Sequence, residues 1–425
     1  MPLRAPAVSE FDRGSVKLAV TILIFCVAAL LALGLVMLYS SSMALNGARL
    51  LVLQTVWCGI GLASCMVMAL VDYRILRRFW WVLFGATVAL LALVLVSGTV
   101  HGHARRWFSH GGVSFQPSEF GKIALIIALA WYGERYQRKV GKWIRGIAIP
   151  GLMIGVTAGL IFKEPDVGNA LLVCAVGGIL LLISGIRLAY IVPPAILLAA
   201  GVGLFIYHNP MRSQRVVAWM HPEETRRGKG QQAYEAMIAF GSGGLTGKGL
   251  GDGRQKLGFV PEQHTDFILS TIGEELGLAA TLPIVAAYMA IILCGIYISV
   301  NAHDTFGLLL GTGLTFLIGL QAFINVAVVT SVLPNKGLPL PFISYGGSNL
   351  VVMLSIIGIL LSIARRARLT ERSAAGEGGA ERLQGRRSAD NPFKGALRAA
   401  RSLELENPAF VPSQRSVIPQ SCPAP

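Results

Sequence analysis

The chain has 425 residues, of which 54% are hydrophobic and only 14% are charged, and its formal net charge is +15. A soluble domain of this length has more charged residues and fewer long apolar runs, so the composition excludes a soluble globular enzyme and indicates a polytopic membrane protein. We expect the basic excess to face an anionic membrane surface, and we expect no nucleic-acid partner.

Apolar runs of about 20 residues, enough to cross a hydrocarbon core about 30 Å thick, recur along the chain. They predict an all-α fold with an N-terminal tail at 1–16, a membrane domain at 17–364 and a C-terminal tail at 365–425. Ten spanning helices are predicted, at 17–40, 50–71, 79–97, 118–133, 146–163, 167–185, 188–206, 268–298, 305–331 and 343–364. The run at 118–133 is short and partly charged, so a count of nine stays open.

The basic residues of the short loops predict the orientation, because Lys and Arg accumulate in short loops on the cytoplasmic side. With the N-terminus inside, the basic segments 72–78 and 133–146, Arg187 and the end of the last helix at 365–368 all lie inside. We therefore expect both termini in the cytoplasm. The long segment 207–267 would then form an extracytoplasmic loop.

The sequence after Ala364 changes to RRARLTERSAAGEGGAERLQGRRSADNPFKG, which has too few large apolar residues for a core. We expect a disordered cytoplasmic tail that serves as a solvated extension, a docking segment or a basic strip at the membrane surface. Five of the six cysteines lie inside apolar runs, so neither a disulfide nor a metal site is indicated.

Ionisable residues gather where predicted helices meet the outer face. Glu119 and Lys122 lie three residues apart, KEPDVGN at 163–169 joins two helices, and Arg212 and Arg215 follow the helix 188–206. Each has a structural interpretation, namely an intrahelical ion pair, an aspartate that caps the next helix, and arginines that extend toward the interface. Their convergence from separate segments instead favours a site for an anionic phosphate substrate.

The stretch LGFVPEQHTDFILSTIGEELG at 257–277 holds Asp266 directly before an apolar run. Thr265 could cap the helix that begins there, and Asp266 could favour its positive end. Alternatively, Asp266 is a carboxylate held at the membrane surface for chemistry. The neighbouring stretch GSGGLTGKGLGDG at 241–253 lacks the spacing of a phosphate loop, so it is either a turn region or a backbone contact for a ligand.

Five stretches occur in an order that resembles the SEDS family (shape, elongation, division and sporulation). They are RRWFSHGGVSFQPSEFGKIAL, KEPDVGNALL, RSQRVVAWMHPEE, YEAMIAFGSGGLTGKGLGDGRQKLGFVPEQHTDFILSTIGEELG and LPNKGLPLPFISYGGSNLV. The resemblance covers about residues 15–365, and QKLGFVPEQHTDFI and NKGLPLPFISYGGSNL are closer to the FtsW branch than to the RodA branch. Glu164 and Asn169 stand where the family pattern has Gln and Thr, and GHARRW carries an extra basic residue.

The resemblance implies a ten-helix peptidoglycan glycosyltransferase that polymerises lipid II into glycan strands at the outer face of the cytoplasmic membrane. It also implies Asp266 as the essential aspartate and a role in septal wall synthesis. The partners it implies are lipid II, a class B penicillin-binding protein, other division proteins and membrane lipids.

Glycosyl transfer from an undecaprenyl-pyrophosphate carrier needs a base for the acceptor hydroxyl and positive charge for the departing pyrophosphate. Asp266 is the candidate catalytic base. The candidate substrate-binding residues are Arg106, Lys122, Arg212 and Arg215, with Glu119 orienting Lys122. The sequence indicates no cofactor and no metal ligand set, and assistance by a divalent cation, Mg²⁺ or Mn²⁺, stays open.

Two other classes of function stay open at this point. A flippase for the lipid-linked precursor would also use charged groups and flexible glycine-rich loops, and a scaffold of the division machinery would use them for assembly. A flippase needs charged residues along a path at mid-membrane depth. The charges of this sequence cluster instead at the outer helix ends, which favours the enzyme.

Overall fold

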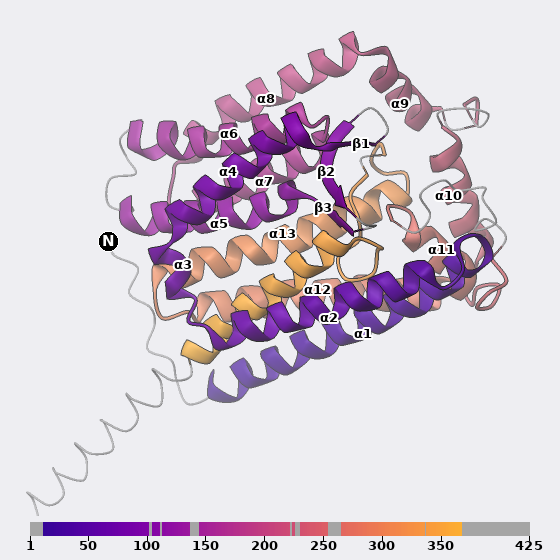
Figure 1. Cartoon of the computed structure of the whole chain (residues 1–425), viewed down its shortest axis with the longest axis horizontal. Coiled ribbons are helices and arrows are strands. Elements are labelled where there is room, and N and C mark those ends of the chain that lie inside the picture. The colour runs from indigo at the N-terminus through magenta and orange to yellow at the C-terminus, as the bar shows by residue number, and fades with distance from the viewer. Residues whose placement is uncertain are drawn as a thin grey trace, which may run out of the picture. The chain divides into compact units, whose positions relative to one another are not determined.

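The structure, a computed structural model, describes residues 12–101, 104–110, 113–136, 144–221, 223–225, 230–253, 265–335 and 337–367 (Figure 1). The predicted C-terminal tail from residue 368 and the first eleven residues lie outside this part of the chain. Long helices dominate the described residues, which confirms the predicted all-α membrane fold.

The predicted apolar runs correspond to ten helices. They are α1 (Asp12–Asn46), α2 (Arg49–Leu70), α4 (Trp80–Ser97), α5 (Pro117–Tyr136), α6 (Ile149–Lys163), α7 (Val167–Ile183), α8 (Leu188–His208), α12 (Leu278–Val300), α13 (Thr305–Val329) and a final helix (Gly347–Ala367). Eight helices in the described ranges are long and apolar enough to cross a membrane. The other two of the ten are α7, which is shorter, and α5, which carries charged residues, so the count of ten spans stays a prediction.

The predicted single helix at 268–298 is wrong, because the structure divides it into α11 (Ile268–Leu276) and α12. Gly277 separates them with φ at 67°, a left-handed conformation that glycine adopts without a Cβ clash. A Cβ at Gly277 would also lie 2.4 Å from the backbone nitrogen of Gly247. The glycine-rich segment therefore packs directly against this helix break.

The loops contain secondary structure that the sequence pattern did not predict. The predicted loop 207–267 includes α9 (Pro210–Met220) and α10 (Gln231–Ser242). The segment between α4 and α5 forms an antiparallel sheet of order β1-β2-β3, with strands β1 (Thr99–His101), β2 (Ala104–His110) and β3 (Val113–Phe115). Two short elements, α3 (Arg74–Arg78) and the π-helical turn η2 (Ile144–Ala148), complete the described chain.

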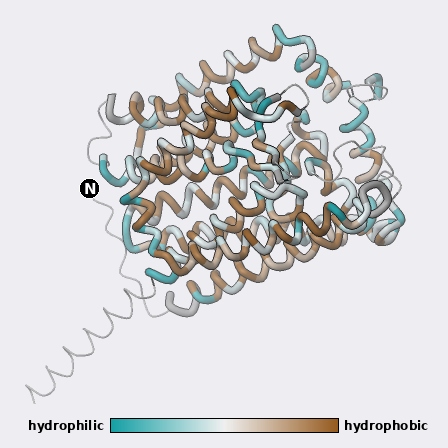
Figure 2. The backbone as a smooth tube through the Cα atoms, viewed as in Figure 1, coloured by the Kyte–Doolittle hydropathy of each residue, from teal (hydrophilic) through white to brown (hydrophobic). Residues whose placement is uncertain are grey.

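The sheet, α9, α10 and α11 lie at one end of the long helices, and α3 lies at the other end (Figure 1). Figure 2 shows that hydrophilic residues concentrate at the two ends while the helices between them are mostly hydrophobic. This distribution matches a bundle whose apolar middle crosses a bilayer.

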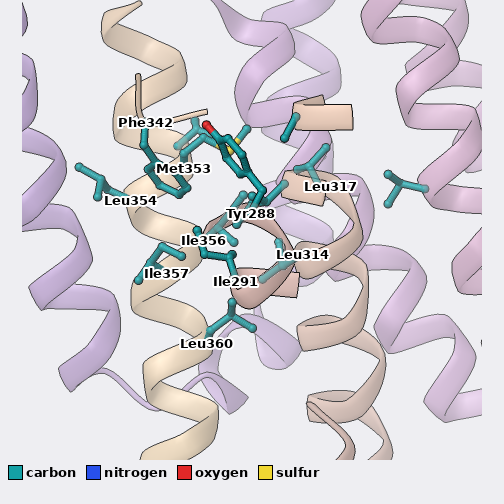
Figure 3. Close-up of a cluster of buried hydrophobic side chains, with 14 of the residues drawn as sticks. Tyr288, Ile291, Leu314, Leu317, Phe342, Met353, Leu354, Ile356, Ile357 and Leu360 are labelled. Atoms are coloured by element: carbon teal, nitrogen blue, oxygen red, sulfur yellow. The ribbon is translucent and has the colours of Figure 1, made fainter. Parts of the chain in front are cut away.

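The core lies around α13, which packs against α5, α7 and α12. In the 18-residue apolar stretch of α13, 72% of the residues are buried, and in that of the final helix 83% are buried. Figure 3 shows side chains of α12, α13 and the final helix meeting in this core, Tyr288 and Leu317 among them. By contrast, α8 has no buried residue, so its apolar side chains are available to lipid.

Candidate functional site

A buried polar network joins α5, α7, α13 and the final helix. The ammonium group of Lys122 donates to Glu119 Oε1 at 2.8 Å, to Asn169 Oδ1 at 3.1 Å and to Gln321 Oε1 at 3.1 Å. The second carboxylate oxygen of Glu119 accepts a hydrogen bond from Asn349 Nδ2 at 2.7 Å. A buried ion pair is tolerated when its remaining donors and acceptors are satisfied, as they are here.

The network gives Lys122 a different position from the one expected of a pyrophosphate ligand. The whole residue is only 1% exposed, and its three N–H groups are matched by three oxygen acceptors. The predicted pairing with Glu119 is present as an i,i+3 ion pair. In this geometry Lys122 acts on a substrate only through its partners, and the expected direct contact with pyrophosphate lacks support.

Side chains of α13 hold the proline-rich loop, which we define as residues 337–346. Gln321 Nε2 donates to the carbonyl of Pro339 at 2.9 Å, and Asn325 Nδ2 donates to the carbonyl of Leu338 at 2.7 Å. A proline has no N–H to donate, so a loop of this composition is fixed mainly through its carbonyls. Gln321 therefore contacts both Lys122 and this loop.

Asp266 lies half-buried in the turn before α11, against the proline-rich loop. Its backbone carbonyl accepts a hydrogen bond from Asn325 Nδ2 at 2.8 Å, and the carbonyl of Thr265 accepts one from Ser344 Oγ at 2.5 Å. A Cβ at Gly337, whose φ is 62°, would lie 3.1 Å from Asp266 Oδ2. Asn325 of α13 thus fixes the backbone of Asp266, the loop fixes that of Thr265, and the loop approaches the carboxylate of Asp266 closely at a glycine.

The structure lends no support to the alternative that Thr265 caps the following helix. The N-cap position of α11 is Phe267, and no side chain forms a capping hydrogen bond there. Asp266 lies one residue before that position, so the alternative that its charge favours the positive end of α11 stays open. The role of Asp266 as a catalytic base stays a prediction.

Arg106, on β2, is fixed to the turn between α6 and α7. Its Nε donates to the carbonyl of Glu164 and its Nη2 to the carbonyl of Pro165, both at 2.7 Å. Its guanidinium carbon also lies 5.8 Å from the ring centroid of Trp107. These bonds use two of the five guanidinium N–H groups and orient the charge at this end of the bundle.

Arg212 and Arg215 lie on α9, which follows α8 directly. The guanidinium of Arg212 lies 4.5 Å from the ring centroid of Phe205, a cation–π distance. Burial lowers the pKa of Arg212, and the positive charges of Arg215 and Arg106 lower it further. Within the described ranges none of these three arginines forms an ion pair with a carboxylate, so no acidic side chain neutralises their positive charges.

The turn between α6 and α7 contains two acidic residues in different environments. Asp166 caps α7, as predicted, since its carboxylate accepts from the backbone and side-chain nitrogens of Asn169 at 3.1 and 2.9 Å. Glu164 is 0% exposed, and neither carboxylate oxygen has a hydrogen-bond partner among the described residues. Burial, and then the charge of Asp166, raise the pKa of Glu164 to about 8 against the opposing effect of Arg106.

The structure connects most of the candidate residues through hydrogen bonds and packing contacts. Arg106 contacts the α6–α7 turn, Asn169 links that turn to Lys122, and Gln321 links Lys122 to the loop beside Asp266. Sequence reasoning missed the neutral members of this network, which are Asn169, Gln321, Asn325 and Asn349. The one feature of the sequence that could have indicated them is a side-chain amide inside an apolar run.

In the described ranges no set of three or more histidine, cysteine, aspartate or glutamate side chains is arranged to hold a metal ion. The assistance of Mg²⁺ or Mn²⁺ therefore stays a prediction.

The fold and the site define a polytopic α-helical membrane protein with a buried ionic network and a group of arginines at one end. A family model described as a cell cycle protein, FtsW/RodA/SpoVE, matches residues 20–369. The chain belongs to this family, which confirms the predicted SEDS resemblance.

Relatives of known name cover most of the chain. A probable peptidoglycan glycosyltransferase FtsW from Trichlorobacter lovleyi is 38% identical over 357 residues, which span 82% of this chain and 93% of the relative. A protein of the same name from Coxiella burnetii is 36% identical over 354 residues, which span 80% of this chain and 95% of the relative.

Solved structures of similar chains support the same fold. A chain from the structure described as "Structural coordination of polymerization and crosslinking by a peptidoglycan synthase complex" has a TM-score of 0.70 and 29% identity, covering 81% of this chain and 97% of that chain. The rod shape determining protein RodA of Thermus thermophilus has a TM-score of 0.62 and 28% identity, covering 81% and 95%.

Proposed function

We propose that this chain is a peptidoglycan glycosyltransferase that polymerises lipid II into glycan strands at the outer face of the cytoplasmic membrane. The observation that carries the proposal is the presence of a carboxylate turn and three arginines at one end of an apolar helix bundle. The names of relatives that match over most of their length support the same activity.

The arginines suit the charged part of the substrate. A lipid-linked disaccharide carries a diphosphate between sugar and lipid, and this diphosphate leaves with the bonding electron pair when the glycosidic bond forms. Arg106, Arg212 and Arg215 would bind the diphosphate of donor or acceptor, because guanidinium groups form paired hydrogen bonds with phosphate oxygens. The positive charge would stabilise the leaving group as its negative charge grows.

Asp266 would act as the general base of the transfer. Its carboxylate would take the proton from the acceptor hydroxyl, whose oxygen attacks the anomeric carbon of the donor while the bond to the diphosphate breaks. The hydrogen bonds of Asn325 and Ser344 to this turn would hold the carboxylate in position. Glu119 and Lys122 would support the reaction indirectly, by fixing Gln321 and the proline-rich loop that it contacts.

The orientation and the cellular setting form part of the proposal. The end that carries Asp266 would face outward, with both termini in the cytoplasm, as the basic residues of the short loops predict. The FtsW-named relatives support septal wall synthesis with division proteins. The neighbour described as a synthase complex, which couples polymerisation to crosslinking, supports a class B penicillin-binding protein as partner.

Replacing an arginine of the site should weaken lipid II binding and, where that arginine holds the departing diphosphate, should slow turnover as well. We expect Arg212→Gln and Arg215→Gln each to raise the KM for lipid II about tenfold or more, because a hydrogen bond to a charged group contributes about 1.5–3 kcal/mol. Steady-state kinetics of the purified variants in lipid vesicles give this value. Arg187→Gln, which changes an arginine at the other end of α8, is the matched control, and equal KM values in all three variants would contradict the assignment.

A further inference from the structure

Glu164 is a buried acid that the proposed chemistry does not use. Its side chain is fully enclosed and its carboxylate oxygens have no partner among the described residues, although its backbone carbonyl accepts the Nε–H of Arg106 at 2.7 Å. The guanidinium of Arg106, which lies on β2 and is assigned to the substrate, therefore contacts the turn that carries this acidic group.

The surroundings of Glu164 favour its neutral form. An ionised carboxylate that is removed from water without hydrogen bonds costs several kcal/mol, so such a group keeps its proton instead. The charged groups around it are Asp166 in the same turn, which also opposes ionisation, and Arg106 on β2, which favours it. Beyond these, Lys163 is exposed to solvent, and Lys122 is paired with Glu119 and hydrogen-bonded to Asn169.

We propose that Glu164 works as a neutral carboxylic acid beside Arg106, so that no buried negative charge offsets the positive charge that this arginine offers to the anionic diphosphate of the substrate. Ionisation of Glu164 would place a buried negative charge beside the guanidinium and weaken diphosphate binding. The inference rests on the proposed function, because it assigns a specific control of charge to that same site.

The protonation of Glu164 can be tested without any measurement of activity. In infrared pH titration of the purified protein, we expect a carbonyl-stretch band of a protonated carboxylic acid that disappears as the pH rises through about 8. The band should be absent in Glu164→Gln and unchanged in Glu223→Gln, the matched control at an exposed glutamate. Identical spectra for wild type and Glu164→Gln would overturn the proposal.

A second variant keeps the assignment testable if the glutamine variant does not fold. Arg106→Gln removes the charge that opposes protonation, so the band should persist to higher pH than in the wild type. A band midpoint that does not move, or that moves to lower pH, would contradict the assignment to Glu164.

Kinetics then test the consequence for the substrate. We expect the wild-type KM for lipid II to rise about three- to tenfold between about pH 7 and about pH 9, because a buried charge near a guanidinium contributes on the order of 1 kcal/mol. In Glu164→Gln the KM should stay low over this pH range. The change of kcat with pH should be the same in the variant and in the wild type. If KM depends on pH in the same way in both proteins, the proposed effect of Glu164 on diphosphate binding is overturned. A protein that makes no polymer but shows the titrating band would refute the proposed function, while the assignment of a neutral Glu164 would stand.

Discussion

Asp266→Asn is expected to abolish glycan polymerisation, with the rate falling about 10²–10⁴-fold, the usual contribution of a general base. Asparagine keeps the size of the side chain but cannot accept the proton of the acceptor hydroxyl. The backbone of this turn is held by Asn325 and by Ser344, so the variant should fold and insert normally. Polymer length from lipid II, measured on gels at equal protein concentration, gives the rate.

Two controls separate catalysis from structure in this experiment. Lipid II binding by Asp266→Asn should be retained, because the arginines are unchanged. Asp252→Asn, which alters an exposed carboxylate of the glycine-rich segment, should polymerise at the wild-type rate. If folded Asp266→Asn protein makes glycan strands at a near-normal rate, Asp266 is not the base.

Lys122→Met should be the most destabilising change in the site. It leaves the carboxylate of Glu119 buried with Asn349 as its one remaining partner of the network, and breaking a buried ion pair from one side costs about 3–5 kcal/mol. Glu119→Gln should also destabilise the protein, because it removes the negative charge opposite a buried ammonium group. Thermal unfolding in detergent, followed by circular dichroism, measures both effects.

The double variant Glu119→Gln/Lys122→Met distinguishes an ion pair from simple packing. Removing both charges together should recover much of the lost stability, because no uncompensated charge remains in the core. Arg366→Gln is the control, since its contact with Asp72 is 3.7 Å long and half-exposed and should contribute about 1 kcal/mol or less. Additive losses in the double variant would contradict this description of the network.

Apolar run length was sufficient to predict the helices, because a chain in hydrocarbon must satisfy its backbone hydrogen bonds within each segment. It was insufficient at Gly277, where the break depends on close packing against Gly247, a contact that run length does not reveal. The sheet at 99–115 was missed for a related reason. Its strands are short and contain no long apolar run. β2 is held by backbone pairing with β1 and β3, which the length of apolar runs does not reveal.

The spacing of Glu119 and Lys122 predicted their ion pair, because residues three apart share a helix face. It could not predict the other partners of the pair, Asn169, Gln321 and Asn349, which come from three other helices and are brought near by the tertiary fold. For this reason the sequence favoured Lys122 as a substrate ligand, while the structure encloses it.

The proposed function requires that this chain itself joins lipid II units. The most direct test is incubation of the purified protein with lipid II in sealed vesicles, alone and with a class B penicillin-binding protein whose crosslinking is blocked, followed by separation of the products by length. We expect glycan strands that lengthen with time and depend on Asp266. Movement of lipid II across the bilayer without any lengthening would instead identify a flippase, and absence of both activities with the partner present would identify a scaffold.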